Sequence, residues 1–594
     1  MAALRLALAQ VNPTVGALRD NVRILTRRLE EARELGAEIV LFPELVLTGY
    51  PPEDLLSNPE FVEVAREQLL EMAPASRGLL AVVGLPWREN GALHNSAALL
   101  LDGRLRDLFH KGTLPNYGVF DEKRYFRPGR RCPIYRLGQF TFGVNICEDL
   151  WTSQGVPAVQ TRAGARLLLN ISSSPYHAGK GRLRESLLRH RARQHGAAIA
   201  YVNLVGGQDE LVFDGESLLV DASGQVRARA PQFEEGLLVV DVEESWLVPP
   251  AVRSGETVGS AYEEGEFEEP LSESLDEIEA RFHAERVDLE PPARAASPRP
   301  AIPPEYRGTD TRMAEEAEVY RALCLGTGDY VRKNGFGRVI IGLSGGIDSA
   351  LTAAVAVDSL GHEQVLGVSL PSRFNSATSR QGAAEVAARL GLRFLEIPIE
   401  PAYRAFLETL APHFAGAAAD VAEENIQARV RGTLLMALSN KWGHLLLTTG
   451  NKSELAVGYC TLYGDMAGGF GVIKDVPKTL VYRLARYRNS LGPVIPEVTL
   501  TRAPSAELRD HQTDQDLLPP YDLLDEILEA RLEREEDPAA LIARGLDARW
   551  VRTVYRWIDL NEYKRRQGPP GVKITPRAFG KDRRYPITNR WRWE

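Results

Sequence analysis

The sequence has few cysteines and no long apolar run. Its four cysteines lie far apart and form no CxxC pair, which argues against a disulfide framework or a zinc knuckle. No stretch approaches the ~18 uninterrupted apolar residues of a membrane-spanning helix. The first apolar segment is interrupted by Gln10, Asn12 and Pro13, too polar for a signal peptide. These absences predict a protein of the reducing cytoplasm with no membrane partner.

A surplus of basic charge is also missing. The chain has 71 Lys and Arg against 80 Asp and Glu, a formal net charge of -9, so no global positive field is available for a nucleic acid partner. With 44% hydrophobic and 25% charged residues, the composition is that of a folded globular protein. Its 594 residues exceed the ~250–300 at which one core stops growing, and we therefore expect at least two domains.

Two α/β patterns, separated by a connector, divide the chain. In residues 1–245, apolar strands such as 4–11 alternate with amphipathic helices such as 20–35. From 246 to 312 the pattern fails, because an acidic run is followed by a Pro- and Ala-rich one, as in a linker. Residues 313–594 form the second pattern, in which strand and helix alternate again as far as about residue 450, and this predicts a parallel, doubly wound sheet with ligands at the carboxyl ends of its strands.

A glycine-rich loop follows an early strand of the second pattern. It opens a helix, where free N–H groups and the helix dipole favour an anion, and its glycines let the backbone approach phosphate closely. The Walker lysine is absent, so γ-phosphoryl transfer is not expected. A plain strand-to-helix turn is the alternative. The pattern predicts a pyrophosphate site formed by Gly342, Leu343, Ser344, Gly345, Gly346, Ile347, Asp348 and Ser349.

The SGGIDS run in this loop resembles the signature of the N-type ATP pyrophosphatases, which cleave ATP between its α and β phosphates and adenylylate a carboxylate. Segments 424–429 (ENIQAR) and 448–454 (TTGNKSE) resemble the NAD synthetase branch of that family. The resemblance implies a Rossmann-like doubly wound sheet of the adenine nucleotide alpha hydrolase type. It also implies contacts of Thr449 with ATP, and of Asn425, Glu454 and Lys581 with deamido-NAD.

The same resemblance implies Mg²⁺ as the metal and no organic prosthetic group. Asp348 and Glu454 are its expected ligands, because a hard cation that bridges phosphates prefers carboxylate oxygens. Lys581 lies in a basic terminal segment, for which a solvated tail is the alternative. Leu462 departs from the TKFGD-like run of the ammonia-only synthetases, which leaves the contacts of Asp465 open.

Three residues of the first half form a candidate catalytic set, and each follows an apolar strand. Glu44 ends EIVLFPE, Lys111 ends LRDLFHK and Cys147 follows FTFGVNI. A cysteine nucleophile needs a base to form its thiolate and a donor for the oxyanion. Each charge alone would be read as solvent-facing, whereas the three types together and in this order favour one catalytic site.

This set resembles the nitrilase superfamily, over about residues 3–245. The resemblance implies an α-β-β-α sandwich in which Glu44 is the general base, Cys147 the nucleophile that forms a thioester, and Lys111 the oxyanion stabiliser. Glu122 resembles the second, positioning glutamate of the superfamily. In the glutaminase branch the expected contacts with glutamine are Tyr117, Ser174 and Lys180.

Together the two resemblances imply one ligase activity, the last step of NAD biosynthesis. Glutamine, ATP and deamido-NAD are the expected small-molecule partners. Because ammonium has no lone pair with which to attack an acyl-adenylate, we expect neutral ammonia to pass through an internal tunnel. We also expect a glutaminase that is silent until deamido-NAD is adenylylated. The resemblance further implies a homo-oligomer, for which an octamer is one form.

Two alternatives stay open at this point. The same pair of domains could act on another acid acceptor, which the acid that stimulates AMP formation would reveal. The chain could also be a binding protein whose enzyme-like halves are inactive, although intact Glu44, Lys111, Cys147 and SGGIDS argue against this reading.

Overall fold

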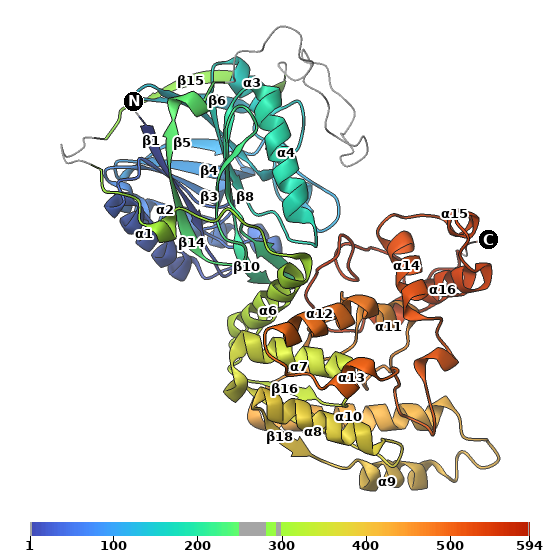
Figure 1. Cartoon of the computed structure of the whole chain (residues 1–594). Coiled ribbons are helices and arrows are strands. Elements are labelled where there is room, and N and C mark those ends of the chain that lie inside the picture. Colours follow the sequence, from blue (N-terminus) through green and yellow to red (C-terminus); the bar gives the residue numbers. More distant parts are fainter. Residues whose placement is uncertain (1–2, 249–280, 293–298, 592, 594) are drawn as a thin grey trace. The chain divides into compact units, whose positions relative to one another are not determined.

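The computed structural model describes residues 3–248, 281–292, 299–591 and 593 (Figure 1). Much of the predicted connector, residues 249–280 and 293–298, lies outside the described residues. The chain divides into an N-terminal unit (1–208 and 213–313) and a C-terminal unit (209–212 and 314–594). Across the described ranges, no helix is both long enough and apolar enough to cross a bilayer.

Two sheets form the centre of the N-terminal unit. The strands of the first are β1 (Ala3–Gln10), β2 (Ile39–Leu41), β3 (Leu80–Glu89), β4 (Ala92–Leu101), β5 (Arg104–His110) and β14 (Gly236–Glu243). Those of the second are β6 (Arg131–Leu137), β7 (Phe140–Ile146), β8 (Leu167–Ser172), β9 (Ala198–Asn203), β12 (Leu218–Val220), β13 (Val226–Arg229) and β15 (His283–Leu289). Their orders are β14-β1-β2-β3-β4-β5 and β13-β12-β9-β8-β7-β6-β15, with a separate hairpin of β10 (Val205–Gln208) and β11 (Leu211–Asp214).

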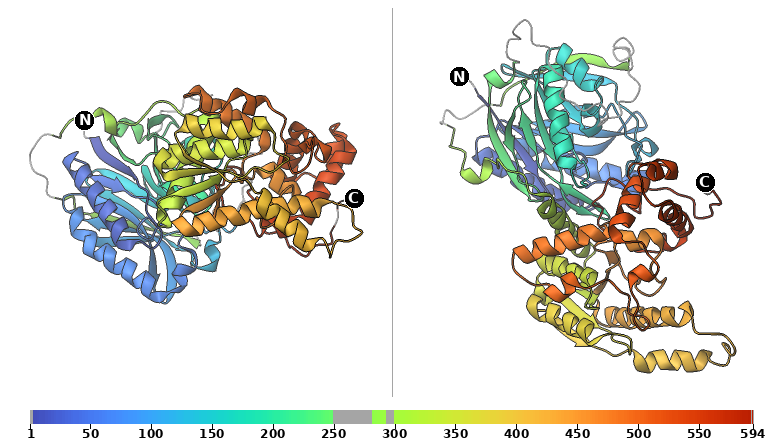
Figure 2. Two further views of the ribbon diagram at one scale, coloured as in Figure 1. Left: turned by 90° about the horizontal axis from the view of Figure 1, so that it is seen from below. Right: turned by 45° about the vertical axis from the view of Figure 1, so that its right-hand side comes forward.

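Helices cover both outer faces of this pair of sheets. On one side lie α1 (Leu18–Glu34) and α2 (Pro59–Met72), and on the other α3 (Val156–Arg162) and α4 (Lys180–His195) (Figure 1). Figure 2 shows α1 and α2, in blue, side by side from two further directions. Buried side chains of both sheets, such as Leu99 and Leu169, share one core. The predicted α-β-β-α sandwich is confirmed.

Part of the predicted connector belongs to the second sheet. Strand β15 pairs in parallel with β6 along its whole length, from His283 beside Arg131 to Leu289 beside Leu137. Phe282 and Leu289 are buried in the core between the sheets. The described part of the connector therefore completes the edge of the N-terminal unit.

A single parallel sheet forms the centre of the C-terminal unit. Its strands are β16 (Val339–Gly342), β17 (Val365–Ser369), β18 (Arg393–Glu396), β19 (Leu445–Thr448) and β20 (Phe470–Gly471). All neighbouring strands are parallel, in the order β18-β17-β16-β19-β20. The predicted doubly wound sheet is confirmed, and its strand order reverses between β16 and β19, where ligands of such sheets bind.

Helices pack around this sheet. They are α6 (Glu315–Lys333), α7 (Ile347–Leu360), α8 (Ala377–Leu390), α9 (Glu400–Leu410), α10 (Val421–Trp442), α11 (Lys452–Val457) and α12 (Lys478–Ser490). Helices α6, α7 and α12 pack together, whereas α10 packs on β16 and β19. After α13 (Glu497–Thr501), a second apolar cluster joins α14 (Tyr521–Leu532), α15 (Pro538–Ala543) and α16 (Ala548–Leu560), and α17 (Glu562–Arg565) follows.

Gly84 in β3 allows the loop after β2 to approach the sheet closely. A Cβ atom at Gly84 would lie 2.4 Å from the Pro43 carbonyl oxygen. We expect Gly84→Ala to lower the free energy of unfolding by about 3 kcal/mol, the upper end for overpacking. Gly236→Ala, at a position with open space, is the control. Urea unfolding of both variants is the measurement, and equal midpoints would contradict the expectation.

Candidate functional site

The predicted catalytic residues of the N-terminal unit meet at the ends of its strands. Lys111, directly after β5, places its Nζ 2.7 Å from Glu44 Oε1 and 2.8 Å from Glu122 Oε1. Glu122 begins a short 3₁₀ helix, Glu122–Arg124. Cys147, directly after β7, is 3% exposed and lies close enough to Glu44 and Lys111 for their charges to act on its thiol. The structure thus brings all four residues into one buried site.

Two residues that the sequence did not single out hold Glu44 in place. Asn95 Nδ2 donates to Glu44 Oε1 at 2.7 Å, and the Ser173 backbone N–H donates to Glu44 Oε2 at 3.1 Å. Asn95 is a buried amide in the His94-Asn95-Ser96 run of strand β4, and this polar run in a largely apolar strand was the signal available. These donors fix the carboxylate that faces Lys111.

The backbone presents Cys147 on a tight turn. Cys147 has a φ of 41° and begins the 3₁₀ helix Cys147–Leu150, a left-handed conformation that is uncommon away from glycine. Asp149 stabilises this turn, since its carboxylate accepts hydrogen bonds from the backbone N–H groups of Ile146 (3.0 Å), Gly112 (3.0 Å) and Thr113 (2.7 Å). One side chain therefore joins the turn that carries Cys147 to the loop after Lys111.

Burial and charge set the protonation of this site. Burial alone would lower the pKa of Lys111, but the Glu122 and Glu44 carboxylates outweigh it and raise that pKa, so the ammonium stays charged. Burial raises the pKa of Glu122 to about 7, although Lys111 opposes this shift. Burial, with the nearby Glu44 charge, raises the pKa of the Cys147 thiol. The resting site therefore holds a neutral thiol beside a charged lysine.

Two of the three predicted glutamine contacts act on Glu148, which follows Cys147 in the chain. Tyr117 Oη donates to both Glu148 carboxylate oxygens at 3.0 Å. The Lys180 charge also acts on Glu148, and Lys180 Nζ lies 4.1 Å from the Trp151 ring centroid. Ser174 is buried, and its backbone N–H donates to Asn203 Oδ1 at 2.9 Å. Sequence reasoning missed Glu148, for which its place beside Cys147 was a signal.

In the C-terminal unit, the predicted phosphate loop joins β16 to α7. Gly345 has a φ of 84°, and a Cβ atom there would lie 2.1 Å from the Ser379 carbonyl oxygen, so only glycine fits. Ser344 Oγ accepts from the Gly346 N–H at 3.2 Å and lies 3.1 Å from Ser349 Oγ. Ser344 and Gly346 are exposed, as an anion site at the first turn of α7 requires.

A lysine that the sequence analysis missed joins the two predicted metal ligands. Lys478 Nζ bonds Asp348 Oδ2 and lies 3.3 Å from Glu454 Oε1, and Asn451 Nδ2 donates to Asp348 Oδ1 at 3.0 Å. Burial raises the pKa of Glu454 to about 8, while Lys478 opposes this shift. A lysine at the first position of α12 is disfavoured by the helix dipole, which was the available signal.

These carboxylates fit Mg²⁺ as part of a donor set. Two oxygen ligands from protein, completed by substrate phosphates and water, are the usual arrangement for this ion. The described residues contain no group of three or more His, Cys, Asp or Glu side chains that could hold a metal by themselves.

The remaining predicted residues of this unit are placed separately. Thr449 directly follows β19, across the strand switch from the phosphate loop. Asn425, on α10, accepts from Thr461 Oγ1 at 2.7 Å. Lys581 is exposed and lines a cavity of about 400 Å³ together with Lys474. Glu454 and Lys474 line a smaller neighbouring cavity of about 20 Å³.

The state of the Cys147 thiol can be measured directly. Because its pKa is raised, we expect no thiolate at neutral pH in the absence of substrate. Ultraviolet thiolate absorbance of the protein should then equal that of a Cys147→Ala variant. A thiolate signal that disappears in the variant would show that the lysine, not burial, controls this group.

Comparison with family models divides the chain as its fold does. A carbon-nitrogen hydrolase model matches residues 5–246, and an NAD synthase model matches residues 319–568. The first match contains the candidate site residues of the N-terminal unit, and the second contains those of the C-terminal unit except Lys581.

Relatives match over the whole chain. A glutamine-dependent NAD(+) synthetase of Thermotoga maritima is 45% identical and aligns over 100% of both chains. One of Xylella fastidiosa is 44% identical over 99% of both chains. A solved glutamine-dependent NAD+ synthetase from Acinetobacter baumannii, in complex with adenosine diphosphate, is 39% identical over 100% of both chains, with a TM-score of 0.73. This chain therefore belongs to the family of glutamine-dependent NAD(+) synthetases, which are ligases of NAD biosynthesis.

Proposed function

We propose that Glu44, Lys111, Cys147 and Glu122 are the glutaminase residues of this enzyme, and that the 342–349 loop binds ATP. The observation that carries the first assignment is the Lys111 ammonium, held between two buried carboxylates beside a buried thiol. A cysteine nucleophile, a general base and a cationic donor for an oxyanion are thereby present together.

The first reaction is the hydrolysis of the glutamine side-chain amide. Glu44 takes the Cys147 proton as the sulfur attacks the amide carbon. Lys111 uses two of its three N–H groups on Glu44 and Glu122, which leaves one for the developing oxyanion. Glu44 returns the proton to the leaving nitrogen, ammonia departs and a thioester remains. Water, deprotonated by Glu44, then attacks the thioester carbon, the carbon–sulfur bond breaks and glutamate is released, and Glu44 returns the proton to the Cys147 sulfur.

Glutamine recognition follows from the charges around Glu148. We assign Tyr117, Ser174 and Lys180 as the contacts of glutamine. The Lys180 ammonium suits the α-carboxylate of this amino acid. The Glu148 carboxylate, with Tyr117 bonded to both its oxygens, suits the α-ammonium group. The site then recognises both charges of a free amino acid.

The second reaction is the amidation of deamido-NAD. A substrate carboxylate oxygen attacks the α-phosphorus of ATP and pyrophosphate leaves, which gives an acyl-adenylate. Neutral ammonia attacks the acyl carbon, loses a proton and displaces AMP to give NAD. The 342–349 loop and Thr449 hold ATP in this proposal, and Asn425, Glu454 and Lys581 contact deamido-NAD. The strand switch between β16 and β19 supports this placement.

Asp348 and Glu454 would hold Mg²⁺, which when bound neutralises phosphate charge during adenylylation. The further expectations from resemblance belong to the same proposal: a cytoplasmic homo-oligomer, an octamer among its forms, and an ammonia tunnel that couples the two reactions. Light scattering of the intact chain measures the oligomeric state.

Replacement of the nucleophile tests the division of labour. We expect Cys147→Ala to abolish NAD formation from glutamine and to retain it from ammonium, because only the amide cleavage needs the thiol. NAD, AMP and glutamate are followed with ATP, Mg²⁺ and deamido-NAD present. Cys132→Ala, which removes another buried thiol of the same unit, is the control and should keep both activities.

Two other results would contradict the proposal. If Cys147→Ala still used glutamine, the nucleophile would be a different residue. If the unmodified protein released glutamate but formed no NAD, the acceptor would be a different acid.

Removal of the shared lysine tests the synthetase site. We expect Lys478→Met to lower NAD formation from glutamine and from ammonium by the same factor, roughly 10–100-fold, as for partners of metal ligands. The reason is that Asp348 loses its ion-pair partner and Glu454 loses the cation that opposes its protonation, so neither carboxylate is held ready for the metal. Lys441→Met, at an exposed position near the end of α10, is the control. A loss restricted to glutamine would place Lys478 outside the synthetase site.

A further inference from the structure

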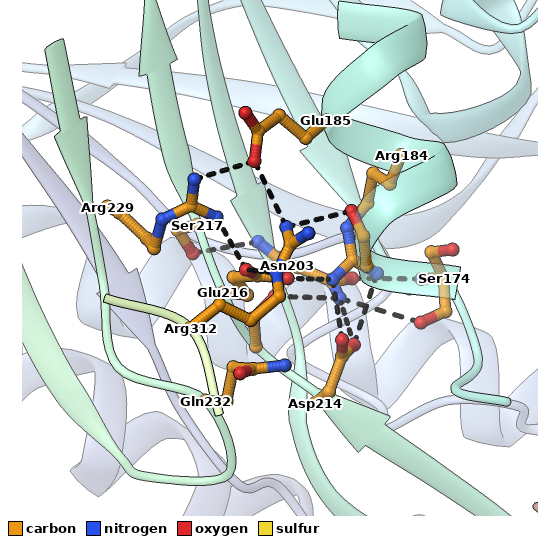
Figure 3. Close-up of polar contacts among 12 residues, drawn as sticks. Ser174, Arg184, Glu185, Asn203, Asp214, Glu216, Ser217, Arg229, Gln232 and Arg312 are labelled. Atoms are coloured by element: carbon orange, nitrogen blue, oxygen red, sulfur yellow. Dashed lines mark hydrogen bonds and ion pairs between the residues drawn. The ribbon is translucent and has the colours of Figure 1, made fainter. Parts of the chain in front are cut away.

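A cluster of six charged side chains, none of them a proposed catalytic residue, lies in the N-terminal unit (Figure 3). Its three arginines and three carboxylates balance in charge and bond one another. The members are Arg184, Glu185, Asp214, Glu216, Arg229 and Arg312. Arg184, Asp214 and Glu216 have side chains no more than 1% exposed, so each charge depends on its partners.

Arg312 enters this cluster from the connector. Its Nε lies 2.6 Å from Glu216 Oε1, and its Nη2 lies 3.2 Å from Glu185 Oε2 and donates to the Gly181 carbonyl oxygen at 3.0 Å. The side chain is only 16% exposed. One guanidinium therefore joins two carboxylates and a backbone carbonyl, a rigid set of directions that lysine cannot reproduce.

The hydrogen bond to the Gly181 carbonyl oxygen places Arg312 near Lys180, a proposed contact of glutamine. Gly181 follows Lys180 in the first turn of α4. A Cβ atom at Gly181 would lie 2.5 Å from Glu216 Oε2, so this turn packs directly on the carboxylate that Arg312 binds. Arg312 thus holds the backbone beside Lys180 both directly and through Glu216.

The other end of the cluster reaches Ser174. Arg184 forms two hydrogen bonds with Asp214, at 3.1 and 2.6 Å, and Asp214 Oδ1 accepts from Asn203 Nδ2 at 3.3 Å. Asn203 Oδ1 in turn accepts from the Ser174 N–H. The neighbouring Ser173 N–H bonds Glu44. A continuous path of polar contacts therefore runs from the connector to both ends of segment 173–181 and to the general base.

Arg312 also stands where the chain leaves this unit. The backbone N–H of Met313 donates to Gln232 Oε1 at 3.0 Å, and Ala314 already belongs to the C-terminal unit. Arg312, two residues before the C-terminal unit begins, is thus tied to segment 173–181.

We propose that Arg312 is a positioning residue for glutamine: from the end of the connector it fixes segment 173–181, which carries Ser174 and Lys180. This inference rests on the proposed glutamine contacts. Because the same guanidinium anchors the chain that leads into the synthetase unit, a displacement of that chain loosens the glutamine segment.

The test compares Arg312→Met with Arg299→Met. Arg299 is a second connector arginine that bonds a carboxylate, Glu38, and a carbonyl oxygen, that of Ala3, but touches no residue of the cluster described here. We measure the KM and kcat for glutamine and for ammonium in NAD formation, the glutamate released per NAD, and the Tm. Arg312→Lys and the double variant Arg312→Met, Glu216→Gln complete the set.

For Arg312→Met we expect a KM for glutamine raised about tenfold, within the usual range of coupling between sites. More glutamate should be released per NAD, whereas the ammonium kinetics should be unchanged. Arg312→Lys should be intermediate. The double variant restores charge balance without the lost contacts, so its KM should stay raised even if charge alone had destabilised the single variant. Arg299→Met should keep the glutamine KM.

Three results would overturn the proposal. The glutamine KM could stay unchanged in Arg312→Met, it could return to normal in the double variant, or both donors could be affected equally with a lowered Tm. The last result would indicate a merely structural role. Cys147→Ala tests the catalytic set without touching Arg312, so failure of that assignment is read independently.

Discussion

One ammonium group shared by two carboxylates holds each candidate site together. Lys111 joins Glu44 to Glu122, and Lys478 joins Asp348 to Glu454. Burial disfavours every one of these charges, and mutual attraction compensates for it only while the group is complete. Each lysine therefore fixes two acidic residues that come from separate segments of the chain.

Both groups form where strands end, because parallel strands deliver their loops to a common edge. In the N-terminal unit β2 runs parallel to β1 and β3, and the loop after β2 carries Glu44. In the C-terminal unit the loops after β16 and β19 meet at the reversal of strand order. The same geometry thus places the proposed nucleophile of one unit and the proposed phosphate loop of the other.

The sequence indicated which strand-end residues lie together in the N-terminal unit, but it did not indicate the residues that hold them in place. Glu44, Lys111 and Cys147 each follow an apolar run, a local pattern that a reader of one strand can detect. Lys478 lies 130 residues from Asp348, and Arg312 lies 96 residues from Glu216. No local periodicity encodes such pairings, because they depend on how distant loops meet.

Element boundaries show the same limit. The predicted strand that ends at Glu44 is shorter in the structure, since β2 ends at Leu41 and the loop turns away beside Gly84. The helices between 521 and 565 were not predicted at all. Their apolar faces pack on one another and on residues of α11, so their stability comes from tertiary contacts more than from local pattern.

The pairing of β15 with β6 determines where this chain can be divided. A glutaminase fragment cut at the end of the first sequence pattern, near residue 245, would lose a seven-residue edge strand. The N–H and C=O groups along β6 would then face solvent beside the opened core, a template for pairing with another molecule. An isolated glutaminase unit would need the chain through at least Leu289 to avoid aggregation by strand addition.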